Sequence, residues 1–371
     1  MDKYHDNPVY KKLAQRLDTI PNGFPATESG VELRILAKLF KPEEAALALH
    51  MKLATQYAEQ IAQHEGDDPH AAEETLKGMA AKGLIRMKRG EKGPMFGLMP
   101  FIVGIYEMQI SHMDKELAQL FEEYYKEAFH GALRMQPSMQ RVIPVEKAVQ
   151  VGLEVLPYER ASDILAHAQS WGVLDCICRT QKKLLGQPCE HPINICLMFS
   201  KKPNAYEKAK HIKSLTKEEA LEVLRRAEEA GLVHTTGNYQ GEIDYICNCC
   251  ACACAILRGA AEFGIVSVLA PSAFKASVDK NLCSGCELCL ELCQFKALSM
   301  VDSICKVDER HCFGCGICIS ACPDEELSLK PRPAVEVKAP PESLGDWMME
   351  RAAVRGLDPD KLTEVLGQTI K

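Results

Sequence analysis

The sequence predicts an α+β protein with a mainly helical N-terminal half and a cysteine-rich C-terminal half. Apolar residues recur at helical spacing through much of residues 31–132, and shorter strand-like runs occur further along the chain. All eighteen cysteines lie between Cys176 and Cys322, and residues 1–175 contain none. Because 371 residues exceed the size of one ordinary domain, we expect several domains.

The first predicted domain, residues 1–105, is a helical lead-in followed by a winged-helix-like segment. A proline stands at the expected start of one helix, and an Asp-Pro pair stands at the expected start of another, which Gly83 ends. The sequence "LIRMKRGEKGPMFGLMPF" then predicts two strands around a glycine-rich turn. The expected helices cover 31–40, 42–51, 55–64 and 69–83. Helices followed by a β-hairpin is the order of a winged helix.

This winged-helix-like segment has two interpretations, DNA binding or packing and protein docking. DNA binding would use helix 69–83 for recognition and the basic side chains of the wing for phosphate contact. These side chains are Arg86, Lys88, Arg89 and Lys92. The helix carries two glutamates for its two lysines, and the chain has a net charge of −7. Both facts favour the docking interpretation, so we do not expect nucleic-acid binding.

The second predicted domain, residues 106–277, is an α+β domain that contains two cysteine groups. A long helical pattern covers 103–132, followed by a strand near 149–156 and a helix near 159–170 that leads to the first group. A further helix is predicted between Thr216 and Gly231, because Thr216 and Glu219 form a capping box and Gly231 suits the C-terminal end.

The last two predicted parts are a compact cysteine-rich module, residues 278–330, and a tail, residues 331–371. The tail is proline-rich and expected to be extended, with a short helix over 344–356.

The cysteine count indicates metal binding in a cytoplasmic protein. The N-terminus lacks the apolar region of a secretory signal, and no apolar run approaches the ~18 residues of a membrane span. Cytosolic thiols stay reduced, so the cysteines are expected to bind metal rather than form disulfides. Thiolates in such numbers oxidise readily in air, which points to an anaerobic host.

The 278–330 module contains two copies of the pattern C-x2-C-x2-C-x3-C. Three cysteines at this spacing reach around one cubane, and the fourth points to the other cluster. Cluster I therefore takes Cys283, Cys286, Cys289 and Cys322. Cluster II takes Cys312, Cys315, Cys318 and Cys293. The module resembles the bacterial 2[4Fe–4S] ferredoxin domain, although Gln294 stands where the second copy has Pro323. Cys305, between the copies, is expected to be a buried strand residue.

The remaining nine cysteines form two groups further upstream. They are Cys176, Cys178, Cys189 and Cys196, then Cys247, Cys249, Cys250, Cys252 and Cys254. In an extended chain both thiols of a C-x-C pair face the same way, so each pair is a potential clamp. We expect one shared cluster, one cluster per group, a larger iron–sulfur assembly, or zinc. Arg179 could offset thiolate charge, and His191 could donate a hydrogen bond or act as a ligand.

The whole chain resembles a group of larger ferredoxin-type iron–sulfur proteins of anaerobes. The resemblance rests on the ferredoxin repeat and on "GFPATESGVELRILAKLF", "DCICR", "NICLMF", "EEAGLVH" and "ICNCC". It implies cytoplasmic electron transfer to a redox partner protein, such as a flavoprotein or a reductase subunit. Two alternatives remain: a reductase, hence an oxidoreductase enzyme, with an open cluster at the Cys176–Cys254 site, and a redox-sensing winged-helix regulator. No sequence feature predicts catalytic residues or the oligomeric state.

Overall fold

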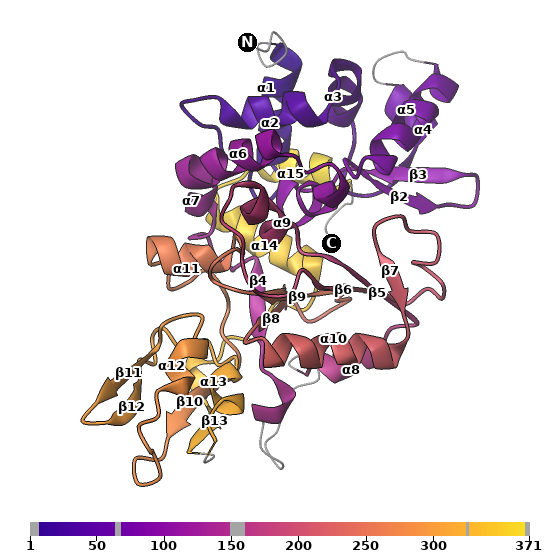
Figure 1. Ribbon diagram of the computed structural model, residues 1–371. Helices are drawn as coiled ribbons and strands as arrows, with labels where there is room; N and C mark the ends of the chain where they lie inside the picture. The colour runs from indigo at the N-terminus through magenta and orange to yellow at the C-terminus, as the bar shows by residue number, and fades with distance from the viewer. Residues whose placement is uncertain (1–6, 64–67, 149–159, 324–325, 368–371) are drawn as a thin grey trace. The chain divides into compact units, whose positions relative to one another are not determined.

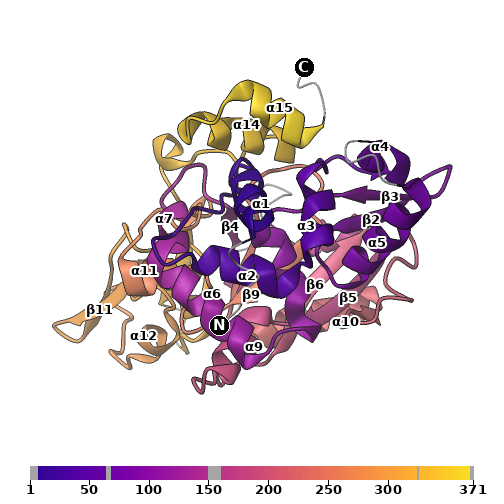
Figure 2. The same cartoon turned by 90° about the horizontal axis from the view of Figure 1, so that it is seen from above.

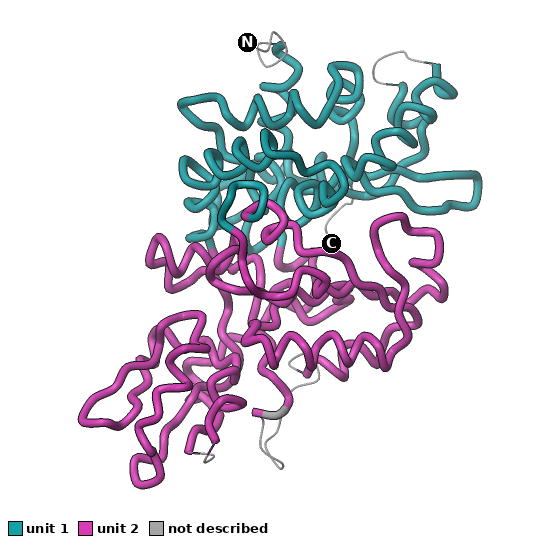
Figure 3. The backbone as a smooth tube through the Cα atoms, in the orientation of Figure 1, with its two compact units in different colours: residues 1–135, 183–187, 348–371 teal, residues 136–182, 188–347 magenta. Residues whose placement is uncertain are grey.

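The computed structural model describes residues 7–63, 68–148, 160–323 and 326–367. Helices and strands are mixed along the chain, which confirms the α+β class (Figure 1). The chain forms two compact units (Figure 3). Unit 1 is Met1–Met135 with Lys183–Gln187 and Met348–Lys371, and unit 2 is Gln136–Lys182 with Pro188–Trp347. The finer division predicted from the sequence, with boundaries after residues 105, 277 and 330, stays a prediction.

The helices of unit 1 begin where the sequence signals them. Asp68 caps the helix that starts at Pro69, and its side chain accepts a hydrogen bond from the Ala71 N–H. Figure 2 shows two of these helices, α2 and α6, side by side. The helices are α1 (Pro8–Asp18), α2 (Val31–Leu39), α3 (Pro42–Leu49), α4 (Ala58–Ala62), α5 (Pro69–Ala81), α6 (Lys115–Tyr124), α7 (His130–Ala132) and α15 (Pro359–Leu366).

Unit 1 also contains a small antiparallel sheet. Its strands are β1 (Gln56–Tyr57), β2 (Arg86–Arg89) and β3 (Pro94–Gly97), in the order β1-β3-β2. The two strands expected around the glycine-rich turn are confirmed as β2 and β3. All four residues of β2 are exposed, and three of them are basic.

The continuous helix expected over 103–132 is wrong. The chain instead forms an irregular turn at Phe101–Ile105 and a short 3-10 helix at Glu107–Ser111 before α6 begins. The Asp114 carboxylate accepts the Leu117 N–H, so a new helix starts at Lys115. From α6 the helical backbone continues through Tyr125–Phe129 to Ala132. The apolar periodicity correctly indicated a helix, but the Asp114 cap determines where that helix starts.

Unit 2 is built on a six-stranded antiparallel sheet of order β4-β8-β9-β6-β5-β7. The strands are β4 (Gln140–Ile143), β5 (Ser170–Asp175), β6 (Asn194–Ser200), β7 (Lys213–Leu215), β8 (Val233–Gly237) and β9 (Tyr245–Cys249). The strand predicted near 149–156 lies outside the described residues. The helix predicted near 159–170 is shorter, α8 (Ala161–Ala166), because the Leu165 carbonyl accepts the Trp171 indole N–H as β5 begins.

Helix α10 (Lys217–Glu229) packs on β5 and β6, below them in Figure 1. Its predicted capping box between Thr216 and Glu219 is confirmed, and Gly231 has the expected positive φ of 69°. Apolar side chains of α8 and α10 form one core with the alternating strand residues Ile195, Leu197, Phe199 and Ile246. Because strand side chains alternate between faces, Cys196, Cys247 and Cys249 point to the other face of the sheet.

The C-terminal part of unit 2 consists of two antiparallel strand pairs, one of them a hairpin, and two short helices. Strand β10 (Phe274–Val278) pairs with β13 (Leu327–Pro331), and β11 (Leu298–Val301) pairs with β12 (Ile304–Val307). The helices are α11 (Leu257–Phe263), which precedes this part, then α12 (Leu288–Leu292) and α13 (Ile317–Ser320). In the tail, a helix expected over 344–356 is confirmed as α14 (Leu344–Val354).

Candidate metal centres

Strand register brings cysteines from distant parts of the sequence together. Leu174 of β5 is opposite Cys196 of β6, and Leu197 of β6 is opposite Ile246 of β9. Continuing the second pairing by one residue places Cys196 opposite Cys247, on the same face of the sheet. Cys176 follows the end of β5, and its N–H donates to the Ile193 carbonyl at 2.8 Å. Three neighbouring strands thus deliver cysteines to one place.

Six of these thiols lie near one another, and each interacts electrostatically with two neighbours in a closed ring. Around the ring the order is Cys176, Cys178, Cys254, Cys249, Cys247 and Cys196, which interacts in turn with Cys176. Three members are buried and three are half-buried. We call this set the six-thiol ring. It takes members from both cysteine groups of the sequence, so the two sequence groups are not two separate sites.

The other three thiols separate from the ring because strand β9 ends at Cys249. A turn follows, in which the Cys254 N–H donates to the Cys250 carbonyl at 3.1 Å. The extended conformation considered for residues 250–254 is therefore absent, and Cys254 joins the ring alone. The Cys189 Sγ lies 3.6 Å from the Cys250 Sγ and 3.2 Å from the Cys252 Sγ.

His191 completes a second, compact group with these three thiols. The ligand atoms of Cys189, His191, Cys250 and Cys252 all lie within 4.8 Å of one another. We call them the Cys3His group. Among the described residues, no other set of three or more Cys, His, Asp or Glu side chains is this close together. The group can hold a metal ion, and Cys252 is its exposed member.

Arg179 connects the ring to the Cys3His group. Its side chain is only 1% exposed, and its guanidinium donates to the Pro192 carbonyl at 3.0 Å and the Asn248 carbonyl at 2.9 Å. It also lies close enough to attract a thiolate at Cys250, Cys176 or Cys249. A buried positive charge here favours negative metal–thiolate groups.

Thiol pKa values in the ring and in the Cys3His group are lowered at some positions and raised at others by these contacts. Hydrogen bonds from Cys178 and Cys196 hold the pKa of Cys176 well below its usual value. Bonds from Cys247 and Cys254 lower the pKa of Cys249 to about 6. A bond from Cys252, assisted by Arg179, lowers the pKa of Cys250 to about 5. Thiolates, which are the form that binds metals, are therefore favoured at three positions.

A buried polar network, which the sequence analysis missed, holds β9 in place. The Asn248 Nδ2 donates to the Ile195 carbonyl, and its Oδ1 contacts the His234 Nδ1, both at 2.5 Å. The His234 Nε2 lies 3.4 Å from a Glu228 carboxylate oxygen. Asn248 lies between two ring cysteines and points to the opposite face, so the network fixes their orientation. The signal available in the sequence was a polar residue, Asn248, at a position where strand alternation predicts a core residue.

The C-terminal part contains two cavities lined by cysteine. One encloses about 330 Å³, part of it open to solvent, and its lining includes Cys283, Cys286, Cys289 and Cys322, together with Cys305. The other encloses about 360 Å³, also partly open to solvent, and its lining includes Cys293, Cys312, Cys315 and Cys318. Each cavity thus collects the quartet that the repeat assigns to one cluster, with three thiols from one copy and one from the other.

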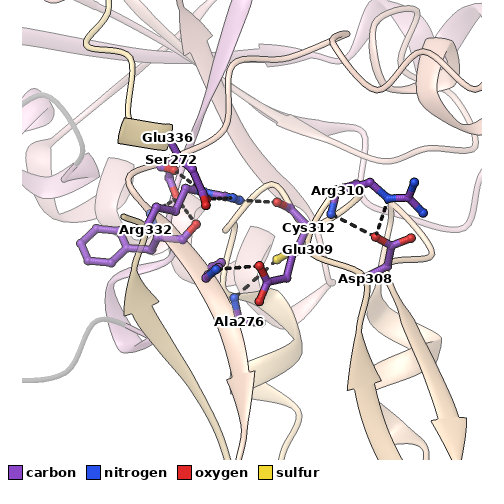
Figure 4. A network of polar contacts seen from close by, with 10 residues as sticks. Ser272, Ala276, Asp308, Glu309, Arg310, Cys312, Arg332 and Glu336 are labelled. Atoms are coloured by element: carbon purple, nitrogen blue, oxygen red, sulfur yellow. Dashed lines mark hydrogen bonds and ion pairs between the residues drawn. The ribbon is translucent and has the colours of Figure 1, made fainter. Parts of the chain in front are cut away.

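Backbone N–H groups point at the thiols of these cavities. Ala297 donates to the Cys293 sulfur at 3.3 Å and Cys305 to the Cys283 sulfur at 3.4 Å. Figure 4 shows the third such bond, from Ala276 to the Cys312 sulfur at 3.5 Å, and Arg332 donating to the Cys312 carbonyl. Such N–H donors stabilise negative charge on sulfur. Cys305 is buried in β12, as expected.

Two further polar residues lie beside the thiols, and of these only Gln294 stood out in the sequence, as a departure from the repeat. Glu326 is 4% exposed, accepts the Cys322 thiol, and accepts the Ser284 N–H at 3.3 Å. Gln294 accepts the Ala251 N–H at 2.8 Å and donates to the Gly231 carbonyl at 3.0 Å. It follows Cys293 directly, so one residue connects the second cavity to the turn between Cys250 and Cys252.

Comparison with family models, curated proteins and solved structures found no match to this chain. No helix among the described residues has both the length and the apolarity needed to cross a membrane. The site is therefore interpreted from its own geometry and chemistry.

Proposed function

We propose that this chain is an iron–sulfur protein that passes low-potential electrons to a redox partner protein in the cytoplasm of an anaerobic cell. Two [4Fe–4S] clusters are held in a ferredoxin-like module by the two cysteine quartets, and a further cluster is held by the six-thiol ring. Clusters of this class exchange single electrons at potentials set by net charge, hydrogen bonds to sulfur and solvent exposure.

The two quartets support the ferredoxin-like part of the proposal. The repeat spacing is that of two-cluster ferredoxins, and each quartet lines a separate cavity. Hydrogen bonds from backbone N–H groups to the sulfurs of Cys283, Cys293 and Cys312 suit bound anionic clusters. No nucleotide-binding or catalytic motif competes with this interpretation.

The closed six-thiol ring is the observation that carries the proposal of a further cluster. Six further thiols arranged in one ring exceed what a carrier with only two quartets needs. No three of them are within 4.8 Å of one another, so they do not converge on one ion. A cluster separates its ligands because each binds a different iron. Six thiols can also saturate a four-iron cluster, which disfavours the alternative of a reductase with an open, substrate-accessible iron.

The residues around the ring have a defined part in this function. Arg179 places a buried positive charge beside Cys176 and Cys249, which raises the reduction potential of a cluster there. The core under β6 and β9 keeps water from the opposite face of the sheet. Asn248 fixes the strand that carries two ring members.

Metal analysis of anaerobically purified protein tests the proposal. Two [4Fe–4S] clusters account for about eight irons per chain, and a cluster in the ring raises this number. The variant Cys254→Ser interrupts the ring between Cys178 and Cys249, so it should lower the additional iron content and alter the EPR signal of that cluster in the reduced state. The matched control Cys305→Ser changes a cysteine that lines the cluster I cavity but belongs to none of the proposed ligand sets, and it should leave the additional iron and its signal unchanged. Iron at or below about eight per chain, unchanged in Cys254→Ser, would refute the ring cluster.

A second candidate function, redox-sensing DNA binding, is favoured by the sheet of unit 1. Its order β1-β3-β2, with α4 and α5 before the hairpin, fits a winged helix, and β2 exposes Arg86, Lys88 and Arg89. It ranks second because Lys77 of α5 is paired with Glu73 and Glu74. Salt-dependent binding of duplex DNA, lost on Arg86→Ala, would support it. Absence of binding at low salt would refute it.

A further inference from the structure

The Cys3His group is a different kind of site from the six-thiol ring. Two of its members, Cys189 and His191, lie in the loop between α9 (Ile177–Leu184) and β6, and the other two lie in the turn after β9. Its four ligand atoms are all within 4.8 Å of one another. Neither the ring nor either quartet of the C-terminal module contains three ligand atoms this close. In the part of the chain that the structure describes, one compact ligand set thus occurs beside three open ones.

The compact spacing fits a single tetrahedral ion. With Zn–S near 2.3 Å and Zn–N near 2.0–2.1 Å, tetrahedral geometry places ligand atoms roughly 3.5–3.8 Å apart. The distances from the Cys189 Sγ to the Cys250 and Cys252 sulfurs, 3.6 and 3.2 Å, already approach this spacing. Three cysteines and one histidine also form a closed set of the type found in structural zinc sites.

The surrounding charge fits a zinc ion with three thiolates. Such a site carries one net negative charge, and the buried Arg179 guanidinium, which lies near Cys250, supplies one positive charge. Arg179 also donates to the carbonyls of Pro192 and Asn248, which are close in sequence to the two halves of the site. The loop and the turn are therefore held near each other without relying on the metal, which lowers the cost of ordering them on binding.

We propose that the Cys3His group binds one Zn²⁺ ion, which fastens the Cys189–His191 loop to the Cys250–Cys252 turn. The same turn continues from Cys249 and leads to Cys254, two members of the six-thiol ring. The ion thus sets the geometry of the neighbouring ring without taking part in electron transfer, because Zn²⁺ has no redox chemistry. This proposal does not depend on the ring holding iron.

Zinc and iron contents of the full chain, purified without oxygen, test the proposal. We expect one zinc per chain. Cys252→Ser, a change at an exposed position, should remove the zinc and leave the iron of the two quartets in place, which also shows that the variant folds. His191→Cys should retain zinc, because four cysteines form an equally suitable set. Replacing zinc by Co²⁺ should give the visible absorption of a tetrahedral thiolate site, absent in Cys252→Ser.

Cys254→Ser separates this proposal from the proposed function. It should keep zinc and lose only iron, so the two sites are counted independently. Zinc that remains bound in Cys252→Ser would overturn the proposal. The proposal would also be overturned if the wild-type protein contained no zinc and its additional iron were lost in Cys252→Ser, because the group would then hold part of a cluster. Eight irons with one zinc would refute the ring cluster and leave this proposal standing.

Discussion

Replacing Arg179 by methionine should destabilise unit 2. The change removes two hydrogen bonds from a charged group to backbone carbonyls, at 3.0 and 2.9 Å, and leaves those carbonyls unpaired. Bonds to charged groups contribute roughly 1.5–3 kcal/mol each, so the loss is about 3–6 kcal/mol. This agrees with the roughly 3–5 kcal/mol expected when one partner of a buried charge pair is removed. For a unit of roughly two hundred residues the apparent Tm should fall by roughly 6–20 °C.

The same substitution should lower the reduction potential of the centre in the six-thiol ring. A unit charge at about 4 Å and an effective dielectric constant of about 20 contributes roughly 4 kcal/mol. For one electron this corresponds to roughly 170 mV, an upper limit, since the transferred electron is spread over a cluster further from the charge. We therefore expect a decrease of roughly 50–100 mV in an EPR-monitored redox titration.

Arg179→Lys is the matched control for these two effects. Lysine keeps the charge but cannot donate to both Pro192 and Asn248 with the geometry of a guanidinium. Arg179→Lys should therefore lose about half as much unfolding free energy as Arg179→Met. It should keep most of the wild-type reduction potential of the centre in the ring. The reasoning is refuted if Arg179→Met melts like the wild type, or if both variants shift the potential equally.

Three further substitutions test single contacts. Glu326→Gln removes a buried negative charge beside Cys322 and should raise the reduction potential of cluster I alone. Glu309→Gln, which changes an exposed ion pair, should leave that potential unchanged. Equal potentials in both variants would contradict this. Gln294→Ala should cost about 1–3 kcal/mol and accelerate hydrogen exchange at the Ala251 amide; unchanged exchange would show that the bond does not persist in solution. Asn248→Ala should cost about 2–4 kcal/mol and release iron from the ring but not from the quartets; a full iron content would exclude its positioning role.

Local signals predicted the helices well. The capping box of α10, the Asp-Pro start of α5 and the hairpin glycines each involve residues within a few positions of one another. They failed between residues 103 and 132, where the apolar period continued through a point at which Asp114 starts a new helix. Gln294 could be recognised only as a departure from a repeat, because its partners Ala251 and Gly231 lie 43 and 63 residues away.

The division of the nine upstream thiols could not be predicted because it depends on where one strand ends. The C-x-C rule holds for Cys247 and Cys249, which share a face of β9 and belong to the ring. It fails for Cys250, Cys252 and Cys254, because the turn after Cys249 sends them to two different sites. Sequence spacing alone is compatible with one site or several. The end of the strand, fixed by pairing with Val233, decides between them.

Strand register therefore determines which cysteines come together in the candidate metal centre. Cys196 reaches the ring only because β6 pairs with β5 and β9 in one alignment, with Leu174 opposite Cys196 and Leu197 opposite Ile246. A slip of β6 by one residue would turn Cys196 into the apolar core and Leu197 toward the thiols. The core under α10 disfavours that slip, since it would expose Leu197 and Phe199 and bury a thiol without its partners. The same apolar side chains that stabilise the sheet thus select the face on which the metal centre is assembled.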